Sequence, residues 1–405
     1  MKNQRIPELD GLRGIAIALV LAFHIPALPV RPGSLLGFVP VFQRMGWSGV
    51  DLFFVLSGFL IGGVLLDARE STNYFQVFYA RRFFRIVPLY AVLLLVVGGS
   101  WLVWPSAKVL GIGRTGISLL PWVTYLLLLQ NFAMTLYGTW GIIPLAVTWS
   151  LAVEEQFYLT LPLFIRSLSR RALFRVALGG IALAPLLRAL CHHLSPQNYF
   201  SWFTLLPCRG DTLLLGVLAA LLLRHSPYRA FLQARRRSLV LLLLVLLMGV
   251  ASLALWAYDF HTSFTMLSAG MSVLAVFYAT LLLYTVLFPS GWLGAGLRWR
   301  PLRTLGTVAY GVYLFHNLIL QFFFNKFLSR RLPSLHSAYD LAILVSAFAV
   351  LFLFCAVTWR FFEKPMLRQG QRWKYRGKAL AQAPPAAHPQ ASLVLVEAHP
   401  PAEKA

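Results

Sequence analysis

Apolar runs of about twenty residues, separated by short basic or polar stretches, recur along the chain. A helix needs roughly twenty apolar residues to cross the hydrocarbon core of a bilayer. The pattern therefore predicts an all-α, polytopic bundle of transmembrane helices. The candidate spans are residues 12–31, 47–66, 86–104, 118–136, 150–165, 176–191, 205–223, 238–257, 264–288, 304–324 and 338–360.

Basic residues predict how these spans are oriented, because cytoplasmic loops are enriched in Lys and Arg. The clusters at residues 81–85 and 166–175 should both be cytoplasmic, so an even number of crossings must separate them. Three candidates lie between them, which indicates that residues 137–165, or the run before them, are partly re-entrant. About ten crossings with both termini in the cytoplasm then fit every large basic cluster, as in a multi-pass protein of the inner (plasma) membrane.

Composition supports lipid as the main surroundings of the chain. Of its 405 residues, 59% are hydrophobic and 12% are charged, whereas a soluble domain carries about 25% charged residues. The net charge of +23 would suit nucleic-acid binding, but its basic residues lie in short clusters between apolar runs. That distribution is typical of basic residues that set the orientation of a membrane protein rather than of a nucleic-acid-binding surface. We therefore expect no nucleic-acid partner.

The last part of the chain differs from the rest. Residues 371–405 are rich in Ala, Pro, Gln and charge, which is typical of disorder. We therefore expect a membrane-embedded domain at residues 1–370, followed by a disordered cytoplasmic tail. Three cysteines (Cys191, Cys208 and Cys355) have neither metal-ligand spacing nor the pattern of a disulfide framework, and no metal site is predicted.

A few ionisable residues lie within the apolar runs, where they are costly unless they are paired or functional. Arg13 and His24 share the first span, eleven residues apart, so they face nearly the same side and differ in depth by about 16 Å. The orientation above puts His24 in the outer half of the membrane. At similar depths it puts five more residues from four other regions: Asp51, Glu154, Arg209, Asp211 and His316. This convergence predicts a site inside the bilayer.

Structural alternatives exist for several of these residues. His24 can serve as an interhelical hydrogen-bonding group, and Asp51 and Arg209 as polar contacts between helices. Arg209 and Asp211 are two residues apart and do not face each other on a helix, so a direct salt bridge between them is not expected. Tyr313, near the His316 face at helical spacing, is more often a packing residue.

The motifs together resemble the membrane-bound acyltransferase family 3, over about residues 5–368. They occur in the family's order and read ELDGLRGIAIALVLAFH, GVDLFFVLSGFLIG, FYARRFFRIVPLY, TWSLAVEEQFYL, Arg209–Gly–Asp211, AYGVYLFHNLI and RFFEKP. The resemblance implies transfer of an acyl group, commonly acetyl, from cytoplasmic acyl-CoA to a hydroxyl of a carbohydrate or lipid-linked glycan acceptor. Some members carry a further extracytoplasmic domain; a chain of 405 residues leads us to expect a single-domain enzyme.

Acyl transfer to an alcohol needs a base, and imidazole suits that task near neutral pH. We expect His24 to be the base, with Glu154 or Asp51 orienting it. The donors to the oxyanion stay open among Arg209, His316, Ser150 and backbone N–H groups.

Substrate binding is expected to use cations and neighbouring polar groups. Arg82 and Arg85 share a helical face at the cytoplasmic boundary, level with Arg13, where guanidinium groups suit the phosphates of acyl-CoA. Asp211 and Tyr313 are assigned to the binding site with them. Acyl-CoA is a co-substrate, and no permanently bound cofactor is predicted.

A transporter or flippase is the main alternative, because buried charges also couple protons to transport. The chain shows no internal repeat and no matching pair of broken helices, which weighs against it. An inactive structural membrane protein is the third hypothesis, and the intact motif residues weigh against that.

Overall fold

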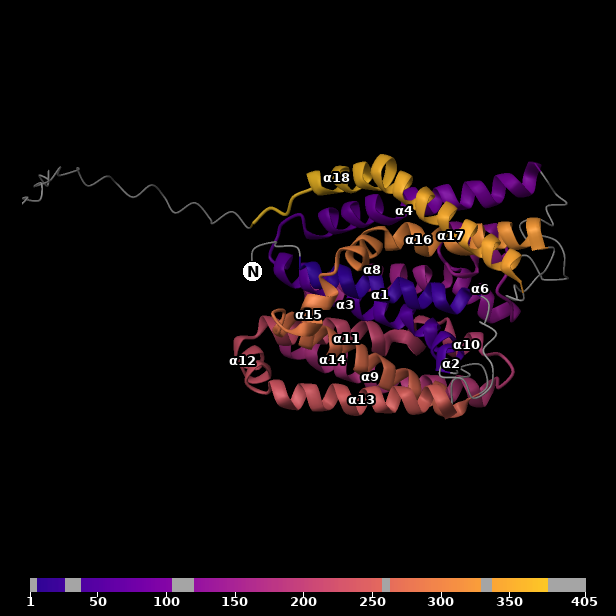
Figure 1. The fold of residues 1–405 in the computed structure, drawn as a ribbon. Coiled ribbons are helices and arrows are strands. Elements are labelled where there is room, and N and C mark those ends of the chain that lie inside the picture. Colours follow the sequence, from indigo (N-terminus) through magenta and orange to yellow (C-terminus); the bar gives the residue numbers. More distant parts are fainter. Residues whose placement is uncertain (1–5, 26–37, 104–119, 257–262, 329–336, 378–405) are drawn as a thin grey trace, which may run out of the picture.

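The protein is a bundle of helices in the computed structural model (Figure 1). The structure describes residues 6–25, 38–103, 120–256, 263–328 and 337–377. The helices are α1 (Pro7–His24), α2 (Phe38–Arg44), α3 (Gly49–Ala68), α4 (Tyr74–Val103), α5 (Trp122–Leu126), α6 (Gln130–Tyr137), α7 (Ile143–Ala146), α8 (Trp149–Ser167), α9 (Arg170–Leu194), α10 (Phe200–Phe203), α11 (Leu206–Arg224), α12 (Ser226–Ala234), α13 (Arg236–Trp256), α14 (Met271–Leu287), α15 (Trp292–Leu297), α16 (Arg300–Phe323), α17 (Ala338–Thr358) and α18 (Lys364–Arg372). Four short 3₁₀ or π segments adjoin some of these helices: η1 (Met45–Ser48), η3 (Met266–Gly270), η4 (Phe324–Leu328) and η5 (Trp359–Glu363).

The prediction of a polytopic helical bundle is confirmed. Within the described ranges, eight helical segments are long and apolar enough to cross a membrane, and the chain is a multi-pass membrane protein. Helices α1 and α8 have 18 and 19 residues, which is close to the length needed to cross a membrane. They are not among the eight segments, and both carry several charged residues. The number of crossings, about ten, stays a prediction.

The candidate span at residues 118–136 is wrong as a single helix. From residue 120 onward, the chain forms α5, α6 and α7, which have five, eight and four residues. The backbone turns at Leu128, whose φ is 56°, and at Gly138, whose φ is 62°. The run is apolar enough for a span, yet these left-handed residues break it. The next continuous helix, α8, begins only at Trp149, so the interruption covers the run before 137–165 and also the first part of 137–165.

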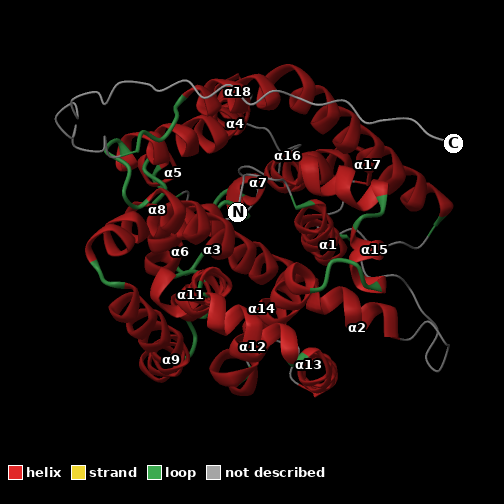
Figure 2. Ribbon diagram, turned by 90° about the vertical axis from the view of Figure 1, so that its left-hand side faces the viewer, coloured by secondary structure: helices red, strands yellow, loops and turns green. Residues whose placement is uncertain are grey.

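Helix α3 lies inside the bundle, whereas α9, α13 and α17 lie on its outside (Figure 2). Glycines allow the inner helices to approach closely, as small residues do in membrane proteins. A side chain at Gly58 would collide with the backbone of α11, and one at Gly216 with that of α3. Gly14 and Gly306 have the same role between α1 and α16. The central helices are therefore held at fixed positions, which matters for the residues they carry.

Ion pairs and hydrogen bonds join the ends of the helices that carry the basic clusters. Arg298 binds Glu8 at 2.6 Å, and Arg224 binds Asp67 at 2.6 Å. Arg69 donates to the carbonyl of Leu168 at 2.6 Å. We call this end of the bundle, on the left in Figure 1, the basic end.

The segment after α18 contacts this same end. Asn73 donates to the carbonyl of Lys374 and accepts a hydrogen bond from the N–H of Arg376. The first residues of the predicted tail at 371–405 are therefore packed against the start of α4, and residues 378–405 lie outside the described part of the chain.

Candidate active site

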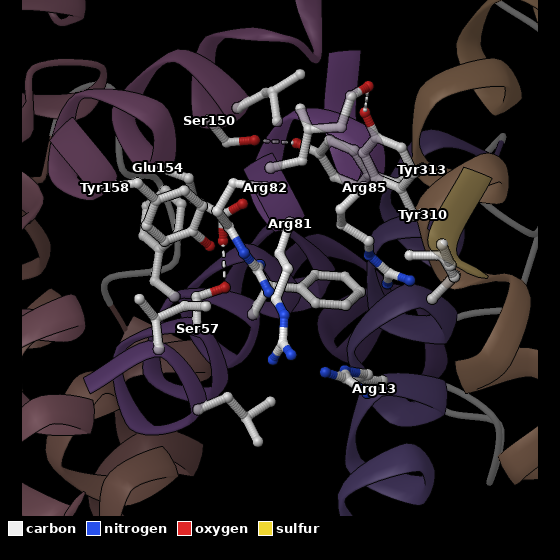
Figure 3. Close-up of a pocket in the computed structure, with 18 of the residues that line it drawn as sticks. Arg13, Ser57, Arg81, Arg82, Arg85, Ser150, Glu154, Tyr158, Tyr310 and Tyr313 are labelled. Carbon is white, nitrogen blue, oxygen red and sulfur yellow. Dashed lines mark hydrogen bonds between the residues drawn. The ribbon is translucent and has the colours of Figure 1, made fainter. Parts of the chain in front are cut away.

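A cavity of about 430 Å³ opens near the basic end and extends into the bundle between α1, α3, α4, α8 and α16. Four arginines line it: Arg13 from α1, and Arg81, Arg82 and Arg85 from the first turns of α4. Figure 3 shows their guanidinium groups pointing into one space. The cavity therefore concentrates positive charge at its mouth.

Aromatic rings position two of these arginines. The guanidinium of Arg82 lies 5.7 Å from the ring centre of Tyr158, and that of Arg85 lies 5.9 Å from the ring centre of Tyr310. Among the described residues, neither arginine forms a salt bridge. Arg13 differs, because it binds Asp10 on its own helix at 3.1 Å. Arg82 and Arg85 thus keep donors available for an anionic ligand.

Arg81, at the mouth, is held by the segment after α18. Its Nε donates to the carbonyl of Trp373 at 2.9 Å, and its guanidinium lies 5.1 Å from the ring centre of Tyr375. Burial raises the pKa of the Tyr375 phenol, so that ring is neutral at neutral pH. The C-terminal segment therefore forms one side of the entrance.

Glu154 lies on the wall of the cavity, one helical turn before Tyr158 on α8. The hydroxyl of Ser57 on α3 donates to its carboxyl group at 2.5 Å (Figure 3). This contact joins α3 to α8 and fixes the carboxyl group within the arginine-lined space.

The inner end of the cavity is formed by Ser150, Phe53 and Tyr313. The hydroxyls of Tyr313 and Ser150 both lie within hydrogen-bond distance of the carbonyl of Val147, at 2.9 and 3.3 Å. The two hydroxyl oxygens are 2.6 Å apart and share a hydrogen bond. The rings of Phe53 and Tyr313 meet edge to face, with centres 6.0 Å apart. Together these side chains close the cavity.

Two histidines lie beyond this wall. The rings of His24, at the end of α1, and His316, on α16, are in contact, with centres 4.7 Å apart and planes at 74°. The Tyr313 ring centre is 5.9 Å from that of His316. The convergence predicted for these two distant residues is therefore present, and Tyr313 lies between them and the cavity.

The tautomer of each ring in its neutral form follows from its hydrogen bonds. His24 Nδ1 lies 2.8 Å from the carbonyl oxygen of Val20, and His316 Nδ1 lies 2.7 Å from that of Tyr313. A carbonyl oxygen only accepts, so each Nδ1 carries the proton and each Nε2 has a free lone pair. The Nε2 of His316 is buried and has no hydrogen-bond partner among the described residues. Two bases therefore face one region.

The prediction that a carboxylate orients His24 is not what the structure shows. The carbonyl of Val20 occupies Nδ1 instead, because the residue four positions earlier on a helix offers its carbonyl to a ring at the last turn. Glu154 is engaged by Ser57 in the cavity, and Asp51 is engaged elsewhere.

Asp51, Arg209 and Asp211 belong to a separate buried cluster. Arg209 donates to Asp51 at 2.6 Å, and Asp211 binds Arg188 at 3.0 Å. All four of these side chains are almost completely buried, and none of them lines the cavity. The expectation that Arg209 and Asp211 do not pair with each other is confirmed. The cluster joins α3, α9 and α11, so it stabilises the bundle rather than contacting the cavity.

This placement changes the set of oxyanion donors. Arg209 is occupied by Asp51, and the rings of Phe54, Trp149 and Phe203 surround its guanidinium. In its present tautomer His316 offers a lone pair towards the site rather than a proton. The Ser150 hydroxyl is engaged with Tyr313.

The sequence did not single out Ser57, Tyr158 or Arg188. Tyr158 lies four residues after Glu154, so helical spacing alone places it on the same face. Ser57 is a single polar residue within an apolar stretch of α3. An isolated serine of this kind is only a weak signal of a functional residue. Arg188 has a run of apolar neighbours on α9, but only the fold brings it to Asp211.

Comparison with known proteins extends these observations. Residues 6–360 match the family model described as an acyltransferase domain, acyltransferase family 3. The O-acetyltransferases OatA of Staphylococcus aureus strains NCTC 8325 / PS 47 and COL are each 27% identical to the chain over 379 residues. In each case the match covers 90% of this chain but 58% of the relative, so the chain spans little more than half the length of these relatives. No solved structure shows a significant match. The chain belongs to the acyltransferase family 3.

Proposed function

We propose that the chain transfers an acetyl group from cytoplasmic acetyl-CoA to a hydroxyl of a carbohydrate or lipid-linked glycan on the outer side of the plasma membrane. One observation carries this proposal: an arginine-lined cavity at the basic end leads to a wall with two histidine bases behind it. The positive-inside rule assigns the basic end to the cytoplasm. The curated relatives named O-acetyltransferase support acetyl as the group transferred.

The arginines of the cavity suit the donor. Acyl-CoA carries phosphates at one end and a thioester at the end of a long flexible arm. Arg82 and Arg85, free of salt bridges with described residues, would bind the phosphates near the mouth. The arm would then extend along Glu154 and Ser57 towards Ser150 and Tyr313.

His24 is the proposed base. Its Nε2 would take the proton of the acceptor hydroxyl as the oxygen attacks the thioester carbonyl. The tetrahedral intermediate then expels the CoA thiolate, which takes the proton from the imidazolium. His24 is partly exposed whereas His316 is completely buried, so His24 is the ring that an acceptor can reach. The lone pair on His316 Nε2 would stabilise the imidazolium.

Because His24 lies beyond Tyr313, the donor and acceptor reach the reacting atoms from opposite sides. Movement of Tyr313 and Phe53 would open the way for the thioester. While Tyr313 and Phe53 are in their present positions, they would separate a thioester in the cavity from water on the outer side.

Replacing His24 with Ala tests the proposal. We expect loss of transfer by at least about 100-fold, the usual contribution of a general base, with the protein still inserted in the membrane. The measurement is incorporation of labelled acetyl from acetyl-CoA into membrane glycans by proteoliposomes. His193→Ala is the matched control, because His193 is exposed on α9 and should leave the rate unchanged.

Full activity of the His24→Ala protein would refute the assignment of the base. Movement of an unmodified glycan across the vesicle membrane without acetyl-CoA turnover would instead support the transporter hypothesis. Mass spectrometry of surface glycans and lipids from cells with and without the gene would identify both the acceptor and the acyl group.

A further inference from the structure

A second cavity, of about 850 Å³, lies at the basic end on the opposite side of α3 from the first. Its polar side is formed by Arg170, Arg171 and Arg175 from the start of α9, and by Arg224 from the end of α11. The two cavities share no lining residue. The second cavity is therefore not an extension of the donor site.

The charges around this cavity are unbalanced. Arg224 forms two hydrogen bonds with Asp67, at 2.6 and 2.7 Å. In the described part of the chain, Arg170, Arg171 and Arg175 form no salt bridge. These three lie in the first two turns of α9, where the positive end of the helix dipole disfavours cations. An anion bound among them would offset both effects.

The other side of the cavity is apolar. Leu66, Phe174, Leu221 and Leu222 form it. Beyond the cavity, α9 continues as a helix with little of its surface buried, and it exposes several large apolar side chains to the surroundings. A ligand with an anionic group and a hydrocarbon chain fits these surfaces better than a free phosphate does.

We propose that this cavity binds the phosphate of an anionic phospholipid from the cytoplasmic leaflet, with an acyl chain lying along α9. Basic pockets between transmembrane helices on the cytoplasmic side bind such head groups in membrane proteins. The arginines of α9 hold the phosphate, and Asp67 keeps Arg224 in place beside them. The lipid joins the ends of α9 and α11, the two helices that also carry Arg188 and Asp211.

The test uses the full chain reconstituted in bilayers of equal parts phosphatidylcholine and phosphatidylglycerol, then released into mild detergent. Native mass spectrometry measures the ratio of the two lipids retained. The variant is Arg171→Gln with Arg175→Gln. The matched control is Arg237→Gln, because Arg237 is an exposed arginine of the same end that lies outside the cavity.

We expect phosphatidylglycerol to be retained by the wild type and by Arg237→Gln. The double variant should bind it about 30-fold more weakly, as follows from removing two cations near the membrane surface. A monodisperse elution profile verifies that the double variant is folded, and both of its substitutions are at exposed positions.

Equal retention of phosphatidylglycerol by all three proteins would overturn the proposal. So would displacement of the lipid by millimolar inorganic phosphate, because the site would then recognise a soluble phosphate. Loss of phosphatidylglycerol from Arg237→Gln to the same extent would also overturn it, since the effect would then come from overall charge.

Discussion

Two sets of arginines lie inside the bundle, and their guanidinium groups contact different partners. Arg188 and Arg209 lie in the buried cluster, where each binds a carboxylate. Arg82 and Arg85 line the first cavity, where each lies against a tyrosine ring. Both sets come from motifs or helices with a similar apolar character, so composition alone does not separate them.

The difference shows which charges maintain the fold and which are available to a ligand. A charge in a low-dielectric interior needs a partner, and Asp51 and Asp211 supply it in the buried cluster. Arg82 and Arg85 lack such a partner among the described residues. We infer that their partner is the substrate, whose phosphates supply the missing negative charge.

The largest effect is expected from breaking the buried cluster. Asp51→Asn leaves the charge of Arg209 buried and without a carboxylate, which should cost about 3 kcal/mol of stability. Thermal unfolding of the protein in detergent measures this loss. Transfer activity should fall only in proportion to the folded fraction.

A double variant separates a structural role for this pair from a catalytic one. Asp51→Asn with Arg209→Met removes both charges and should recover part of the lost stability, because no unpaired charge stays buried. If it also recovers activity, the pair acts on the fold. If stability returns while transfer stays absent, Asp51 or Arg209 takes part in the reaction and the comparison fails.

The cavity arginines should show the opposite behaviour. Arg82→Gln and Arg85→Gln should each raise KM for acetyl-CoA roughly 10- to 100-fold, the value of a charge-assisted hydrogen bond, with little change in thermal unfolding. Steady-state kinetics with varied acetyl-CoA measures the effect. Arg82→Lys keeps the charge but loses the planar pair of donors, so its KM should lie between those of the wild type and Arg82→Gln.

An unchanged KM for both Gln variants, with a lowered melting temperature, would show that these arginines are structural too. The distinction between the two sets would then be lost.

The sequence predicted much of this architecture because hydropathy and charge act locally. Each helix that crosses the bundle has its own apolar run, and the basic clusters lie in the loops next to them. The prediction of one continuous span at residues 118–136 is wrong because hydropathy measures whether a segment is apolar enough to lie in lipid. It does not show whether the backbone of that segment turns. The left-handed residue Leu128 has no sequence signal of the kind that glycine gives.

The site was predicted only in part, for a similar reason. The depth of each residue along its helix, estimated from the sequence, predicted that His24 and His316 lie at one level. In the structure their rings are in contact. Depth does not give the direction around a helix axis. Asp51 and Glu154 were therefore placed near His24, although the fold turns Asp51 to Arg209, whose position is 158 residues away in the chain.

The smallest effect is expected at the exposed pair of Arg224 and Asp67, which extends the comparison to the surface. This pair has the same short contact, 2.6 Å, as Arg209 and Asp51, but its side chains are 27% and 59% exposed. Water solvates both charges when the contact is broken, so Asp67→Asn should cost at most about 1 kcal/mol, seen as a small shift in thermal unfolding that shrinks further in high salt. A loss as large as that of Asp51→Asn would mean that burial does not decide what an arginine pair contributes in this bundle, and the division between the two inner sets would need another cause.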